Sequence, residues 1–348
     1  MARVIAFALA LLLAACATPR RLVFSQGTYR LAHPLVDFYD STFVWTDAGR
    51  GPPRVIDVQE MAARLRNYDV VIYGEFHGHA GVHLGEMRVL RALYARDPHL
   101  VLSLEQFERD TQDALDAYLA ERIGENTLID RGRAWENYAA AYRPLVGFAR
   151  THHLPVVAAE APTWEIACVG QWGLPILDKF SADERGWIAR DVHVGAGAYR
   201  DKFQQFLGGS SVHGGDGDTS EGRIKAERSF AAQAARDDTM AESILAALRK
   251  YPGSQVLHLT GSFHAAGFLG TVERLRMRDP NLKIAVITPI EVADAAEPEF
   301  SAASSSEGTV LQLVYPTPDS FVADEDTSAW VQKMLARRKA DQCKYSPD

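Results

Sequence analysis

The sequence predicts an α/β fold with a mostly parallel sheet flanked by helices and a helical subdomain over the carboxyl edge of the sheet. Short apolar runs occur at residues 69–73, 99–107, 154–161, 255–260 and 283–288, and stretches with helical spacing separate them. Such alternation is typical of βαβ units. Several of these runs end in a carboxylate or in a glycine followed by a histidine, at the strand ends where ligands of parallel sheets collect.

Length and charge narrow the class of protein. The chain has 348 residues, enough for one or two domains with a full core, and an ordinary globular composition. Its net charge is −8, and the longest basic block is Arg337-Arg338-Lys339. Nucleic acid is therefore not expected as a partner, because neutralising phosphates requires a basic stripe.

The first residues predict export and a lipid anchor. Arg3 precedes an apolar run at 4–13, too short to span a bilayer, which ends in small residues before Cys16. This pattern resembles the lipobox of bacterial lipoproteins, which implies a signal peptide at 1–15 and acylation of Cys16. The alternative is an ordinary secretory signal with a chance cysteine. We expect a lipid-anchored protein of the bacterial cell envelope. The residue after Cys16 is Ala17 and not an acidic residue, which resembles the signal for sorting to the periplasmic face of the outer membrane.

Two further cysteines, Cys168 and Cys343, follow Cys16. An oxidising compartment would permit a disulfide between them, but the sequence gives no distance. They are interpreted as structural or incidental, since no CxxC or cysteine-based zinc pattern is present.

After the signal peptide at 1–15, the expected domain organisation has two parts. Residues 16–53 form a tether and an N-terminal edge segment, and residues 54–348 form the α/β domain with helical insertions at about 108–152 and 163–250. Within that domain, Asp57 is expected to cap a short helix. A glycine- and serine-rich stretch at 208–222 reads as a loop or lid, and the chain ends in a late strand at 310–314 and a helix at 329–339.

Two strand ends have the same form, Gly74-Glu75-Phe76-His77 and Gly261-Ser262-Phe263-His264. We expect each glycine to let the backbone turn sharply, so that the histidine projects over the sheet edge. A parallel sheet can bring such edges together. Catalysis is predicted to depend on four residues of these and the neighbouring strand end: Glu75, His77, Glu105 and His264.

Two chemistries remain open for this cluster. A divalent metal held by His77, His83 and His264 would activate water. Metal-free acid/base work with carboxylate-oriented histidines is equally compatible. The structural alternative is that strand-end histidines are solvated or capping, which we expect for His79. Arg236 either pairs with a carboxylate at the sheet edge or belongs to a solvated stripe.

The chain resembles the ChaN-like haem-binding lipoproteins of the Tiki/TraB/erythromycin-esterase superfamily. The resemblance implies an α/β domain with a helical subdomain that binds haem and assists iron acquisition, and it allows a homodimer. Some superfamily members are metal-dependent proteases or hydrolases. Residues 208–222 and those after 286 do not align with the family. The matching pieces, in the family's order, are VVIYGEFHGHAGVH (70–83), LVLSLEQFERDTQ (100–112), WENYAAAYRPLVGFARTHHLPVVAAEAP (135–162), QAARDDTMAESI (233–244) and LTGSFHAAGFLGTVERL (259–275).

The expectation of haem binding rests on the resemblance to the family and not on a sequence motif. No CxxCH is present, so haem would be bound non-covalently. Tyr138 and Tyr142 share a helical face and are the predicted axial ligands, with Arg143 near enough for a propionate. Core packing is the alternative role for both tyrosines. A haem-binding protein is the favoured function, a hydrolase of the same superfamily comes second, and a lipoprotein with a vestigial polar edge comes third.

Overall fold

A computed structural model describes residues 21–209, 219–319, 321 and 343–346. The predictions for the signal peptide, for Cys16 and for the helix at 329–339 lie outside these residues, as does most of the loop predicted at 208–222. No described helix combines the length and apolarity needed to cross a membrane.

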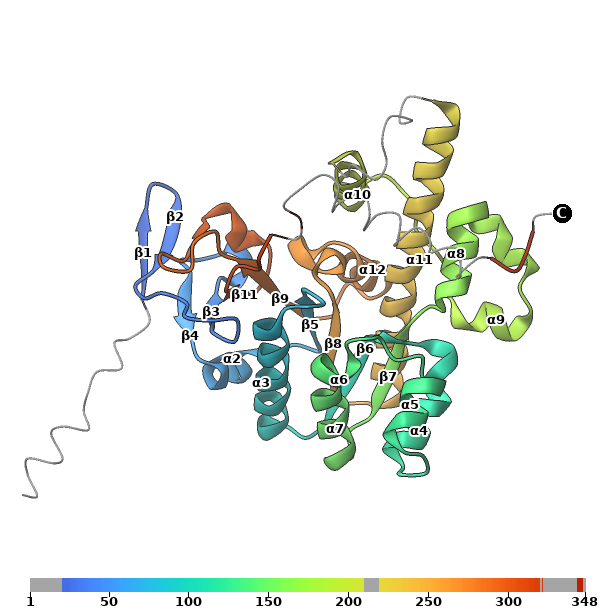
Figure 1. Cartoon of the computed structure of the whole chain (residues 1–348), viewed down its shortest axis with the longest axis horizontal. Coiled ribbons are helices and arrows are strands. Elements are labelled where there is room, and N and C mark those ends of the chain that lie inside the picture. The colour runs from blue at the N-terminus through green and yellow to red at the C-terminus, as the bar shows by residue number, and fades with distance from the viewer. Residues whose placement is uncertain (1–20, 210–218, 320, 322–342, 347–348) are drawn as a thin grey trace, which may run out of the picture.

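The main sheet has eight strands in the order β4-β3-β11-β9-β5-β8-β6-β7 (Figure 1). The strands from β11 to β7 are parallel, and β3 runs antiparallel to both of its neighbours. The predicted α/β class with a mostly parallel sheet is confirmed. The bounds are β3 Ser41–Trp45, β4 Arg54–Ile56, β5 Val70–Glu75, β6 Leu100–Glu108, β7 Val156–Glu160, β8 Gln255–Gly261, β9 Ile284–Glu291 and β11 Val310–Val314.

The N-terminal segment contributes more structure than a tether. β3 pairs with β11 inside the main sheet, so the sheet begins before the domain boundary expected at residue 54. A second, antiparallel sheet joins β1 (Leu22–Ser25) and β2 (Thr28–Leu31) to β10 (Glu299–Ser301), which lies in a stretch expected to be a loop. These strands are only three to five residues long, and their partners come from the other end of the chain.

Helices cover both faces of the sheet because the central strands are apolar on both sides. On β5, Val71 and Tyr73 pack into the cluster formed with α3, α4 and α7, while Val70 and Ile72 pack against α11 and α12. The bounds are α2 Val58–Leu65, α3 Ala80–Arg96, α4 Gln112–Leu119, α5 Glu125–Arg131, α6 Tyr138–Ala141, α7 Arg143–Thr151, α8 Thr163–Trp172, α9 Ala182–Trp187, α10 Ala198–Gly209, α11 Ser220–Lys250 and α12 Thr271–Arg278.

Local chemistry explains where helices start. The Asp57 side chain accepts a hydrogen bond from the Glu60 backbone N–H, which confirms the predicted cap of α2. The helix expected from the spacing at 135–152 is divided at Tyr142 into α6 and α7, with Pro144 in the first turn of α7. Proline is compatible with a first turn because it has no N–H to donate.

The helical subdomain comprises α8, α9, α10 and the first half of α11; α8 and α9 lie beside the β7 end of the sheet, and α10 packs on α11 and on the segment after β8 (Figure 1). Cys168 on α8 forms a disulfide with Cys343, with Cα atoms 4.5 Å apart. This bond fixes the C-terminal segment against α8, where Tyr345 packs on Trp164 and Phe180.

Candidate functional site

The two strand-end histidines lie side by side although they are far apart in the sequence. β5 and β8 are neighbours, and Glu75 is in register with Gly261. A Cβ on Gly261 would lie 2.9 Å from His77 Nε2 and 3.7 Å from His264 Cδ2. The structure therefore brings both imidazoles to one point at the carboxyl edge of the sheet.

The two glycines have a role other than the expected turn. Gly261 has a φ of −54°, which any residue can adopt, and Gly74 is not among the positive-φ glycines. A Cβ on Gly74 would lie 3.0 Å from Ser262 Cα, and one on Gly261 would press on His77. The prediction that glycine is needed for the turn was wrong, because neither position requires a left-handed backbone. Close packing favours glycine instead, against the Ser262 backbone at Gly74 and against the His77 ring at Gly261.

His77 forms one histidine–carboxylate pair. Its Nδ1 lies 2.6 Å from Glu75 Oε1, and the Tyr142 hydroxyl donates to the same oxygen at 2.5 Å. Burial opposes the charge on His77, but the hydrogen bond to Glu75 and the charge of Glu105 raise its pKa. Asn137 Nδ2 donates to the His77 carbonyl at 2.6 Å, which holds the loop in place.

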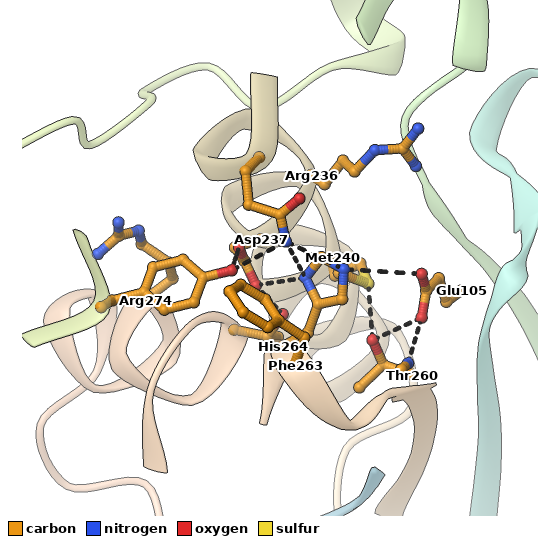
Figure 2. Close-up of polar contacts among 12 residues, drawn as sticks. Glu105, Arg236, Asp237, Met240, Thr260, Phe263, His264 and Arg274 are labelled. Atoms are coloured by element: carbon orange, nitrogen blue, oxygen red, sulfur yellow. Dashed lines mark hydrogen bonds and ion pairs between the residues drawn. The ribbon is translucent and has the colours of Figure 1, made fainter. Parts of the chain in front are cut away.

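His264 forms the second pair, shown in Figure 2. Its Nδ1 lies 2.9 Å from Asp237 Oδ1, and the Tyr199 hydroxyl donates to the other Asp237 oxygen at 2.5 Å. On the opposite side, Glu105 Oε1 lies 3.8 Å from His264 Nε2. Burial lowers the pKa of His264, but Asp237 and Glu105 outweigh it and raise the value to about 9. The imidazole is thus a buried cation between two carboxylates at neutral pH.

Glu105 is itself held rigidly. Its Oε2 accepts hydrogen bonds from the Thr260 hydroxyl at 2.7 Å and from the Gly261 N–H at 2.6 Å. Burial raises its pKa, but the charges of His264 and His77 outweigh that effect and lower it. At the end of the neighbouring strand β7, Arg236 donates a hydrogen bond to Glu160 at 2.8 Å. Of the two roles predicted for Arg236, this is the pairing with a carboxylate at the sheet edge.

His83, the third histidine predicted as a metal ligand, faces a different partner. Its Nδ1 lies 3.0 Å from Glu86 Oε2, one helical turn along α3. Among the described residues, the group whose ligand atoms lie within 4.8 Å of one another is Glu75, His83 and Glu86. His77 and His264 are not part of that group. His79, expected to be capping or solvated, caps α3 by accepting from the Gly81 N–H at 3.1 Å.

The three residues predicted to hold haem are not at one surface. Tyr142 is buried and its hydroxyl is used by Glu75. Tyr138 is buried against Phe107. Arg143 is exposed and pairs with Glu125 at 2.6 Å. The i, i+4 relation holds only across the break between α6 and α7, so the tyrosines serve the core in this structure.

A half-open pocket of about 320 Å³ lies between α3 and α6, next to His77 and His83. Most of its lining is apolar, and Met87 on α3 and Tyr39 are both part of it. The Tyr39 side chain is 62 % exposed. Sequence reasoning missed Tyr39 because it lies in the segment interpreted as a tether, and no local pattern marks it.

Comparisons with known proteins identify a family by its profile and a similar fold by structure. A family profile described as "Haem-binding uptake, Tiki superfamily, ChaN" matches residues 61–275. In structure, the chain is similar to the haem-binding ChaN protein of Campylobacter jejuni, with a TM-score of 0.58 and 15 % identity over 79 % of this chain and 98 % of that one. It also matches a mutant of the erythromycin esterase EreC, with a TM-score of 0.45 and 10 % identity over 82 % of this chain and 100 % of that one. No curated protein matches in sequence.

Proposed function

Because the chain belongs to the haem-binding uptake family ChaN of the Tiki superfamily, we propose that it binds haem non-covalently in the pocket between α3 and α6. Haem sites are mostly apolar clefts with one or two precisely placed polar groups. The pocket has that character, and its volume suits part of a macrocycle with the remainder exposed.

Tyr39 is the proposed axial ligand, and its exposed phenol carries the proposal. The backbone N–H groups of Tyr39 and Asp40 both donate to Asp37 Oδ1, at 2.8 and 3.1 Å, so the turn that presents the phenol is ordered. Tyrosine is an established haem ligand, and bound haem would supply a redox-active iron centre at this pocket. His83 is less available to haem, because its Nε2 is used by the His77 carbonyl and its Nδ1 faces Glu86.

A haemin titration of the purified protein, followed by the Soret band, tests this ligand. We expect Tyr39→Phe to weaken binding at least tenfold and to shift the Soret maximum. Tyr251→Phe, at the far end of α11, is the matched control and should bind as wild type. If Tyr39→Phe binds normally and Tyr138→Phe or Tyr142→Phe does not, the ligand is one of the buried tyrosines predicted from the sequence.

Pairing of two haem-loaded chains is part of the proposal. Val36 is 74 % exposed beside Tyr39, so the rim of the pocket offers apolar surface to a second copy. The related Campylobacter protein binds haem cofacially, which supports this arrangement. Sedimentation should give a monomer without haemin and a dimer with it; a monomer under both conditions would exclude pairing.

We further propose that Cys16 is acylated and that the protein acts in iron acquisition at the periplasmic face of the outer membrane. The Cys168–Cys343 disulfide supports export, because such bonds persist in oxidising compartments. Cys16→Ala should move the protein from the membrane to the soluble fraction. Deleting the gene should impair growth on haem as the iron source, and unimpaired growth would count against a role in uptake.

Hydrolysis is the second candidate function. Its support is the convergence of two histidine–carboxylate pairs at Gly261, where His77 could act as general base and cationic His264 could stabilise developing negative charge. A panel of ester substrates tests it: activity should vanish in His77→Ala. Loss of activity on adding a chelator would show that hydrolysis depends on a metal ion. If no ester is hydrolysed, hydrolysis is rejected and haem binding is the remaining function.

A further inference from the structure

We propose that Glu75, His83 and Glu86 form a binding site for a divalent transition-metal ion beneath the pocket. The site is separate from the proposed haem ligand and does not depend on it. One ligand atom from each of the three residues lies within 4.8 Å of the others. Glu75 ends β5, while His83 and Glu86 lie one turn apart on α3, so the strand–helix unit itself builds the site.

Two carboxylate oxygens at this site are buried with no donor from a third residue, so that they can be joined only by a shared proton or by a cation. They are Glu75 Oε2 and Glu86 Oε1. The ion-pair partners of Glu75 and Glu86 in the described part of the chain are His77 and His83. A buried carboxylate without a partner is costly, and two in contact cannot both stay ionised unless a cation or a proton joins them. A bound metal ion would satisfy both oxygens.

The ring of His83 is oriented as a metal ligand would be. Its Nε2 lies 3.1 Å from the His77 carbonyl oxygen, and a carbonyl can only accept, so Nε2 carries the proton. The lone pair therefore sits on Nδ1, which faces Glu86 Oε2 at 3.0 Å. Metal-ligating histidines usually donate their other ring N–H to a carbonyl or carboxylate in this way.

The donor set and the access route define the ion. Two carboxylates and one imidazole suit Mn²⁺, Fe²⁺ or Zn²⁺, which accept mixed N and O ligands. His83 lines the pocket and its side chain is 10 % exposed, so an ion can enter from there. The Tyr142 hydroxyl donates to Glu75 Oε1 and leaves Oε2 for the metal.

Metal analysis of the full-length protein tests the proposal. Protein stripped with a chelator, incubated with ZnCl₂ or MnCl₂ and desalted should retain about one ion per chain by mass spectrometry. Glu86→Gln keeps the shape of the side chain, and we expect it to reduce retention at least tenfold. Glu121→Gln, an exposed carboxylate, is the matched control and should retain the ion as wild type does.

Thermal unfolding provides the second measurement. The ion should raise the melting temperature of wild type and leave that of Glu86→Gln unchanged, whereas the metal-free variant should be at least as stable as metal-free wild type. Tyr39→Phe should retain the ion, which separates this site from haem binding. Equal retention by wild type and Glu86→Gln, or none by wild type, would overturn the proposal; in the second case Glu75 and Glu86 share a proton.

Discussion

The buried imidazolium of His264 predicts a stability that falls as the pH rises. The pKa of His264 is raised from its ordinary value of 6.5 to about 9: burial alone would lower it, and the carboxylates of Asp237 and Glu105 outweigh burial. Folding therefore favours the protonated ring. That contribution is fully present below about pH 6.5 and is lost as the pH rises through about 9.

The magnitude follows from the difference between the two pKa values. It corresponds to about 3 kcal/mol of unfolding free energy between pH 6 and pH 10, as an order of magnitude. His264→Gln keeps a polar side chain but cannot carry the proton. At pH 6 this variant should be about 3 kcal/mol less stable than wild type, because Asp237 and Glu105 lose the cation between them. At pH 10 the two proteins should differ much less.

Urea unfolding at pH 6, 8 and 10 measures this difference directly. Subtracting the variant from wild type at each pH removes the contribution of other titrating groups. His153→Gln serves as the control, because His153 is an exposed histidine outside both histidine–carboxylate pairs. Parallel pH profiles for wild type and His264→Gln would refute the reasoning, as would an NMR titration that places the pKa of His264 near 6.5.

Three further substitutions test the packing around the site by urea unfolding. Gly261→Ala should cost about 1–3 kcal/mol, because the new Cβ would lie 2.9 Å from His77 Nε2; wild-type stability would mean that the His77 ring can move aside. Tyr142→Phe removes a hydrogen bond to the buried Glu75 carboxylate and should cost about 1.5–3 kcal/mol, and no loss would show that another donor replaces it. Cys168→Ala should cost about 2–4 kcal/mol, and a reductant should destabilise wild type equally but leave the variant unchanged.

Two control variants accompany these substitutions. Gly51→Ala places a methyl group where no atom lies within 4 Å, so it should leave stability unchanged. Tyr251→Phe changes a tyrosine at the end of α11, far from the two histidine pairs, and should behave as wild type. A loss in either control would point to a general fragility of the fold.

The parallel part of the sheet was predictable because each strand is an apolar run followed by a helix. The predicted strand at 255–260, for example, differs from β8 by one residue. β3 was not predicted as part of the main sheet. It is short, and its partner β11 lies more than 250 residues away, so the pairing depends on tertiary contacts that no local pattern contains.

The site was predictable where chemistry coincides with a strand end, as for Glu75, His77, Glu105 and His264. Asp237 lies in the matching stretch 233–244 but was not assigned to the site from the sequence. Its side chain is fully buried on α11, and only the packing of α11 over β8 shows that it faces His264. Glu86 was missed for a similar reason, because its partner Glu75 lies on another element.

The disulfide between α8 and the C-terminal segment limits how the chain can mature. Its two cysteines are 175 residues apart, and every strand from β8 to β11 lies between them. During synthesis Cys168 cannot form this disulfide until Cys343 has been made. Until then Cys16 is the other cysteine of this sequence with which it could pair. If Cys16 carries a lipid, acylation removes that competitor. Lipid attachment would then safeguard correct oxidation as well as anchor the protein.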